Sequence, residues 1–179
     1  MNILEKFLKS RIQKVDLKKY WSYRNDVVKK KGSKLSLYRK YLYVKKAEAF
    51  YNASMGTLIG SGAQFASYPR LPHGLNGIII NHRAIIGKDC IIMHQVTIGD
   101  AHGGVPTIGD NVYIGPGAKI IGGIKIGNNV KIGANCVVFK DIPDNCTVVV
   151  EKPRVIIREE KPDEISIMDD PKNSPDIKS

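Results

Sequence analysis

The chain has 179 residues, of which 42% are hydrophobic, so it is long enough for one domain with its own core and too apolar for a disordered protein. No apolar run is long enough to cross a bilayer, and the N-terminus lacks the apolar segment of a signal peptide, so we expect a cytoplasmic protein. The net charge of +11 belongs to the first 50 residues, which hold 15 Lys and Arg against 4 Asp and Glu, because the remainder holds 13 of each. Three cysteines without metal-binding spacing favour buried small residues over a disulfide framework.

Residues 1–55 predict a basic, helical N-terminal segment. We expect one helix over about residues 2–14 and an amphipathic helix after the Gly-Ser break in "VVKKKGSK". The apolar face of the second helix is expected to hold Leu35, Tyr38, Leu42 and Ala49. Three roles are open for the positive charge: a cap over the end of the following domain, attraction to an anionic membrane surface, and nucleic-acid binding. The lack of a recognised binding motif argues against nucleic acid.

Residues 56–157 hold sixteen of the seventeen glycines and an internal repeat of six residues. Aliphatic residues recur at this period: Ile80, Ile86, Ile92, Ile98, Ile108, Ile114, Ile120, Ile126, Ile132 and Val138. Small or β-branched residues follow most of them by four positions: Ala84, Cys90, Val96, Val112, Ala118, Ile124, Val130 and Cys136. A period of six is typical of a parallel β-helix, in which each hexad is one short strand and a turn. The fold class is therefore mainly β.

The period is interrupted once in this stretch. Ile98 and Ile108 are ten residues apart, so four extra residues form a loop within "GDAHGGVPT". Insertions in repeat folds lie on one face, which is often the binding face. Upstream the pattern is weaker, with one more hexad expected at Ile59 and Ala63. Residues 158–179 are polar and contain proline, and we expect a loosely held tail.

The repeat, the single loop and the run "IGPGAKIIGGIKIGNNVKIGANCVVFKDIPDNC" resemble the hexapeptide-repeat acyltransferases over about residues 50–157. The likeness is to the serine acetyltransferase-like branch, especially its short capsule and exopolysaccharide members. The resemblance implies a left-handed β-helix, a homotrimer with sites between neighbouring prisms, and acetyl-CoA as donor. No metal is expected, because the cysteines and histidines lack metal-binding spacing. It also implies direct acetyl transfer to a hydroxyl, with a histidine as general base.

His94 is the candidate base, since it precedes the loop by one hexad and matches the histidine that the family uses. An imidazole takes a proton near neutral pH, which a hydroxyl needs in order to attack a thioester. One coil of three hexads is about eighteen residues, so Asn76 is expected one coil beneath His94, with His73 nearby. Either of them is a candidate for orienting His94 or binding the acceptor, and His102 in the loop is a candidate for contacting the acceptor or the thioester. His82 is expected on a different face.

The donor site is expected to include residues that align with the CoA channel of the family: Gly99, Pro116, Ala134 and Lys140. Gly115 and Gly133 are expected to let the backbone approach the ligand closely. Lys140 or Arg154 is expected to meet the CoA phosphates, because charged groups make strong hydrogen bonds to phosphate.

The acceptor side departs from the serine acetyltransferases. The aspartate that orients the base is replaced by Ile79, and the loop histidine and arginine that hold the carboxylate of serine do not align here. We therefore expect a hydroxyl of a sugar or glycan as acceptor, with serine as the alternative. Two other classes stay open: a γ-type carbonic anhydrase, for which the histidines lack the expected spacing, and a non-catalytic scaffold.

Overall fold

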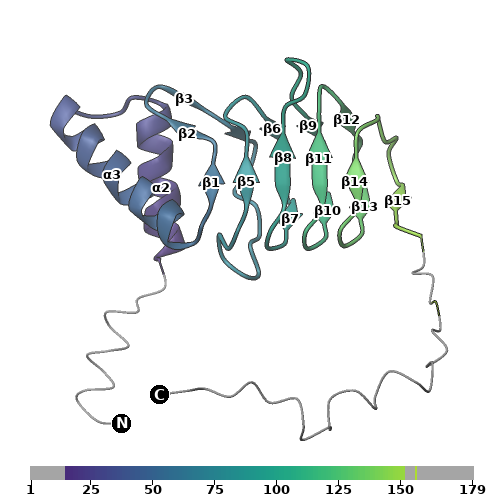
Figure 1. Cartoon of the computed structure of the whole chain (residues 1–179). Coiled ribbons are helices and arrows are strands. Elements are labelled where there is room, and N and C mark those ends of the chain that lie inside the picture. The colour runs from purple at the N-terminus through teal and green to yellow at the C-terminus, as the bar shows by residue number, and fades with distance from the viewer. Residues whose placement is uncertain (1–14, 152–155, 157–179) are drawn as a thin grey trace, which may run out of the picture.

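The hexads wind the chain into a parallel β-helix with three sheets, shown in Figure 1. This computed structural model describes residues 15–151 and residue 156. The first sheet consists of β1 (Ser54–Met55), β5 (Ile79–Ile80), β8 (Thr97–Gly99), β11 (Lys119–Ile121) and β14 (Val137–Val138). The second consists of β7 (Ile91–Ile92), β10 (Tyr113–Ile114), β13 (Lys131–Ile132) and β15 (Thr147–Val148). The third consists of β4 (Gln64–Phe65), β6 (Ile85–Ile86), β9 (Thr107–Ile108) and β12 (Lys125–Ile126).

The register of the sheets follows from the repeat. Ile80 pairs with Ile98, eighteen residues on, and Ile114 pairs with Ile132 at the same interval. Where the loop intervenes the interval grows by four residues, so that Ile98 pairs with Ile120. The insertion therefore leaves the pairing of the coils intact and lies outside it.

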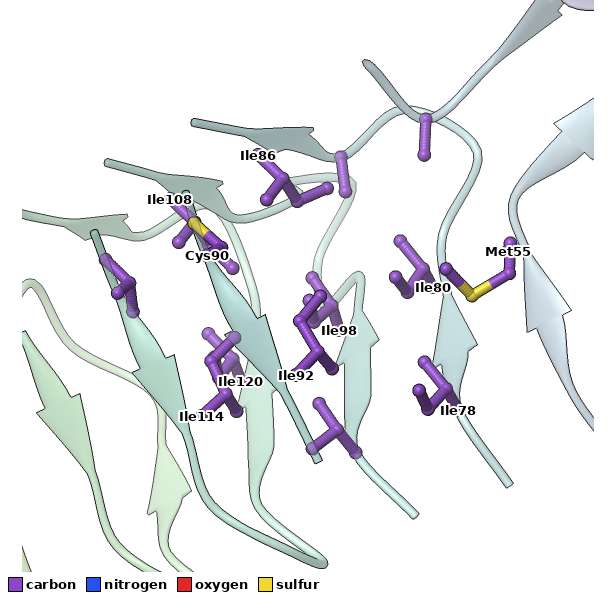
Figure 2. Close-up of a cluster of buried hydrophobic side chains, with 14 of the residues drawn as sticks. Met55, Ile78, Ile80, Ile86, Cys90, Ile92, Ile98, Ile108, Ile114 and Ile120 are labelled. Atoms are coloured by element: carbon purple, nitrogen blue, oxygen red, sulfur yellow. The ribbon is translucent and has the colours of Figure 1, made fainter. Parts of the chain in front are cut away.

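The core of the prism is formed by the repeat residues. Every aliphatic anchor from Ile80 to Val138 is buried, and so is every small residue predicted to follow one. Figure 2 shows Ile92, Ile98, Ile114 and Ile120 packed inside the coil. Burying an isoleucine side chain contributes about 1.5–3 kcal/mol, so the repeat supplies most of the apolar stabilisation of the domain. The predicted β-helix is confirmed.

One upstream prediction is wrong. Ala63 is buried as expected, but Ile59 is half exposed. The reason is a local antiparallel hairpin of β2 (Thr57–Leu58) and β3 (Ser61–Gly62), with Gly60 in its turn at φ 81°. The hairpin interrupts the coil here and turns Ile59 away from the core.

Two helices close the N-terminal end of the β-helix, opposite β15 (Figure 1). Helix α2 (Leu17–Val28) begins where the Asp16 side chain accepts hydrogen bonds from two backbone N–H groups. Helix α3 (Lys34–Phe50) begins at Ser33, which caps it in the same way after the predicted break. Trp21 packs edge-on against Phe65 of the β-helix. The helix expected at residues 2–14 lies outside the described residues, and so does the tail at 158–179.

The apolar face expected for α3 is wrong. Leu35, Tyr38 and Leu42 are exposed, whereas the helix buries Leu37, Val44, Ala47 and Glu48. The end of the β-helix presents hydrogen-bond donors as well as apolar surface, and an acidic residue satisfies them. No helix in the described part of the chain is both long and apolar enough to span a membrane.

Glu48 is the centre of a buried polar cluster between the cap and the first coil. Its Oε1 atom accepts hydrogen bonds from the Tyr20 hydroxyl at 2.9 Å, the Thr57 hydroxyl at 3.0 Å and the Met55 N–H at 3.3 Å. Its Oε2 atom accepts one from Lys45 at 2.9 Å. Burial, followed by the nearby charge of Glu48, raises the pKa of Tyr20 well above its ordinary value. The cluster ties the helices to the β-helix.

Candidate active site

The candidate base lies at the edge where the second sheet turns into the first, which we call the histidine edge. Hydrogen bonds between successive turns stack its residues in order. Gln95 N–H donates to the Asn76 carbonyl at 2.9 Å, and Gly117 N–H donates to the His94 carbonyl at 3.0 Å. Asn135 N–H then donates to the Pro116 carbonyl at 2.9 Å. The edge therefore carries Asn76, His94, Pro116 and Ala134 one above another, with Asn76 one coil before His94 as the coil length predicts.

The backbone conformation of the turns at the histidine edge explains which residue types occupy them. Gln95, Gly117 and Asn135 have φ of 59°, 71° and 55°, in the left-handed region that glycine and asparagine adopt with least strain. Gln95, which directly follows His94, is neither glycine nor asparagine, so its backbone is the most strained of the three. A residue in this conformation fixes the direction of the backbone at the candidate base.

His94 and His73 form a contacting pair. Their ring centroids are 4.8 Å apart and the rings are inclined at 75°, an edge-to-face arrangement. His94 is half-buried, and its Nδ1 atom is buried with no hydrogen-bond partner, whereas His73 is exposed. A buried polar atom without a partner is uncommon and costs free energy. The arrangement therefore leaves the candidate base with an unused nitrogen next to a second imidazole.

A cavity of about 400 Å³ lies on the His73 side of this pair, and His94 is not among the residues that line it. His73 and Asn76 line it, together with Tyr51, Leu71 and residues at the start of α2. The cavity brings two of the three predicted acceptor-binding residues, His73 and Asn76, onto one hollow surface between the helical cap and the β-helix, and His102 does not line it.

Lys119 is a feature of the histidine edge that sequence reasoning missed. Its Nζ atom donates hydrogen bonds to the Gln95 and Gly117 carbonyls, both at 3.0 Å. It therefore connects the turn that carries His94 to the turn of the next coil. The only signal in the sequence is a lysine beside a buried anchor, which is common in a strand.

The residues predicted to bind acetyl-CoA are divided between two edges. Pro116 and Ala134 follow His94 on the histidine edge, whereas Gly99 and Lys140 lie at the opposite edge of the first sheet, where the loop also begins. Arg154 lies outside the described residues. A ligand that meets all of the described donor residues would have to cross the first sheet.

Gly115 and Gly133 have packing roles that the sequence did not show. A Cβ atom on Gly115 would lie 2.7 Å from the Ala134 nitrogen, and one on Gly133 would lie 3.1 Å from the Val148 carbonyl oxygen. The next coil thus occupies the space that a side chain needs. Close stacking of coils explains both glycines without a ligand.

The inserted loop lies at the edge where the first sheet turns into the third, which we call the loop edge. It is closed by paired hydrogen bonds between Ala101 and Gly104, and His102 at its tip is exposed. Arg83, one coil earlier, donates to the Gly103 carbonyl at 3.1 Å and lies 3.6 Å from Asp100. The structure does not bring His102 together with His94 within one chain. His82 is exposed beside Arg83, on a different edge from His94 as expected.

Comparisons with known proteins place the repeat region in a family. Residues 106–140 match the model described as "Bacterial transferase hexapeptide (six repeats)". The serine acetyltransferase of Synechococcus elongatus is 43% identical over 110 residues, 58% of this chain and 43% of that protein. That of Mycobacterium tuberculosis is 39% identical over 125 residues, 68% of this chain and 54% of that protein. The repeat region thus carries the hexapeptide repeat found in bacterial transferases.

Solved structures agree with this hexapeptide domain. Serine acetyltransferase of Neisseria gonorrhoeae in complex with serine has a TM-score of 0.60 at 29% identity, covering 76% of this chain and 54% of that one. Isoform 3 of Entamoeba histolytica in complex with cysteine has a TM-score of 0.57 at 32% identity, covering 70% and 46%. The coil is accordingly the left-handed β-helix of these transferases. The chain spans about half the length of the relatives it matches.

The prediction of a sugar hydroxyl as acceptor is wrong on these comparisons, because the relatives of this hexapeptide domain are named serine acetyltransferases. It rested on single missing residues, such as the aspartate replaced by Ile79, whereas the similarity extends over 110 residues or more. Across the described residues, no three His, Cys, Asp or Glu side chains gather closely enough to hold a metal ion.

Proposed function

We propose that this chain is an acetyltransferase that moves the acetyl group of acetyl-CoA to the hydroxyl of serine, with His94 as general base. The observation that carries the proposal is the similarity to serine acetyltransferases from several bacteria, together with a half-buried histidine at the edge of the β-helix. This replaces the sugar acceptor by the alternative that the sequence left open.

The chemistry needs one proton acceptor. The neutral His94 imidazole takes the proton of the serine hydroxyl, whose oxygen attacks the thioester carbonyl carbon. The resulting tetrahedral intermediate collapses with cleavage of the carbon–sulfur bond. The imidazolium returns the proton to the CoA sulfur, so the products are O-acetylserine and free CoA.

Two neighbours support the base in place of the missing aspartate. His73 holds the His94 ring from one side by the edge-to-face contact. Lys119 fixes the backbone of the turn through the Gln95 carbonyl. We assign Lys119 a positioning role, since it acts on His94 through the backbone, and we assign His73, Asn76 and the loop residue His102 to the acceptor.

Acetyl-CoA is assigned to the face of the first sheet, between the histidine edge and the loop edge. Pro116 and Ala134 border this face on one side, and Gly99 and Lys140 border it on the other. Exposed apolar side chains lie on or beside it, namely Ile79, Val137 and Phe139. Apolar surface of this kind suits contact with another subunit, and it supports the expected homotrimer, whose neighbouring chain would bring its loop edge to the histidine edge.

The test measures release of free thiol from acetyl-CoA by the purified full chain with and without serine. We expect serine-dependent release, and we expect His94→Ala to lower its rate by roughly 10²–10⁴-fold, the usual contribution of a general base. Lys88→Ala, an exposed residue between β6 and β7 that lies on neither the histidine edge nor the loop edge, is the control. No serine-dependent release by the wild-type chain would refute the acceptor. Undiminished turnover in His94→Ala would remove that residue from the mechanism.

A further inference from the structure

Helix α3 carries an apolar stripe on its outer side. Leu35, Tyr38 and Leu42 are spaced three and four residues apart, which places them on one helical face, and they are exposed by 70%, 55% and 49%. Phe50, at the end of the helix, is 65% exposed. The helix thus buries Leu37, Val44 and Ala47 together with Glu48, and it leaves a second apolar row on its solvent side.

The charges around this α3 stripe have one sign. Lys34, Arg39 and Lys46 are exposed on the same helix. The only acidic residue of α3 is Glu48, which is buried and bonded to Lys45. No carboxylate of α3 therefore offsets the three exposed cations.

The apolar stripe and the positive charges of α3 together indicate which kind of partner would cover this face. A second copy of α3 would bring its own cations against these cations, and like charges across an interface oppose association. An anionic lipid surface suits both the apolar side chains and the cations, because it accepts apolar and tyrosine side chains at the headgroup level and attracts lysine and arginine. We propose that α3 lays its apolar stripe on the surface of an anionic phospholipid bilayer. This goes beyond the acetyl transfer and does not depend on it.

The position of the helix is compatible with docking from the end of the molecule. Figure 1 shows α3 at the end of the β-helix opposite β15. His94, Pro116 and Ala134 instead follow one another along its length. A bilayer that meets α3 at this end leaves the rest of the histidine edge accessible to small molecules.

The experiment is co-sedimentation of the full chain with vesicles of phosphatidylcholine alone and of phosphatidylcholine with phosphatidylglycerol. We expect binding to the anionic vesicles only, weakening as salt rises because surface charges are screened. Each basic residue near an anionic surface is worth about 1 kcal/mol, or about fivefold, so Lys34→Gln, Arg39→Gln and Lys46→Gln together should weaken binding by about 100-fold. Leu35→Gln with Leu42→Gln should also abolish sedimentation.

The matched control removes the same net charge elsewhere. Lys88, Lys125 and Lys131 are exposed on the β-helix, and their replacement by glutamine should leave vesicle binding within about twofold. Circular dichroism checks that all variants are folded. The proposal is overturned if the wild-type chain ignores anionic vesicles at low salt, or if both charge variants lose binding equally. It is also overturned if the stripe variant alters the oligomeric state and not vesicle binding, which would make a second copy the partner.

Discussion

Replacement of Glu48 tests whether the polar cluster holds the helical cap on the β-helix. Glu48→Leu removes the acceptor of three donors, the Tyr20 hydroxyl, the Thr57 hydroxyl and the Met55 N–H. Tyr20, Thr57 and Met55 are each at most 1% exposed, so water does not replace the lost acceptor. Glu48→Gln keeps an oxygen for these three donors, removes the charge, and replaces the oxygen that accepts from Lys45 by an amide NH2 group.

The magnitudes follow from this count of donors. A buried donor without a partner costs about 1–3 kcal/mol, so Glu48→Leu should lower the free energy of unfolding by at least about 3 kcal/mol. Glu48→Gln changes charge-assisted bonds into neutral ones and also removes a buried charge, so we expect a loss of only about 1–2 kcal/mol. For a chain of this size the leucine variant should melt roughly 6–12 °C lower.

Urea unfolding followed by tryptophan fluorescence measures both variants. Trp21 is the only tryptophan and lies in the cap, so its emission reports the junction itself. The order of stability should be wild type, then glutamine, then leucine. A leucine variant as stable as the glutamine variant would refute the reasoning, because apolar packing alone would then hold the cap.

Two further predictions concern the histidine edge and the core. Lys119→Met should lower kcat about tenfold while leaving the KM for acetyl-CoA within about twofold. Lys119→Arg should recover part of this loss of kcat, since arginine retains a donor to the Gln95 carbonyl. Steady-state kinetics measure both variants, and an equal loss of kcat in both would contradict the positioning role. Ile114→Ala should lower the free energy of unfolding by about 2–5 kcal/mol in a urea titration, because the side chain is fully buried, whereas a change below 1 kcal/mol would show that the coil collapses around the gap.

The β-helix was predictable because its rule is local. Each anchor such as Ile92 is specified by its neighbours six residues away, and the coil needs no distant information to form. The same arithmetic placed Asn76 one coil before His94. The prediction that Ile59 is buried is wrong because a hairpin with Gly60 in its turn replaces one turn of the coil. A hairpin of two short strands carries little sequence signal.

The cap and the site were less predictable because they depend on contacts between distant segments. Tyr38 and Leu42 have the spacing of a buried face, yet the donors on α2 and the first coil favour Glu48 inside. The contact of His73 with His94 depends on the path of an irregular segment before β5. The acceptor was mispredicted because the absence of particular residues was given more weight than similarity along the whole domain.

The loop edge has a consequence for how this architecture changes. The loop leaves after β8 and returns before β9, and the coils on either side keep their pairing of Ile80 with Ile98 and of Ile86 with Ile108. The bridge between Ala101 and Gly104 closes the loop on itself. Segments of other length and chemistry can therefore be exchanged at this point without reshaping the prism, so the surface of the loop can diverge while the folding of the coils stays constant.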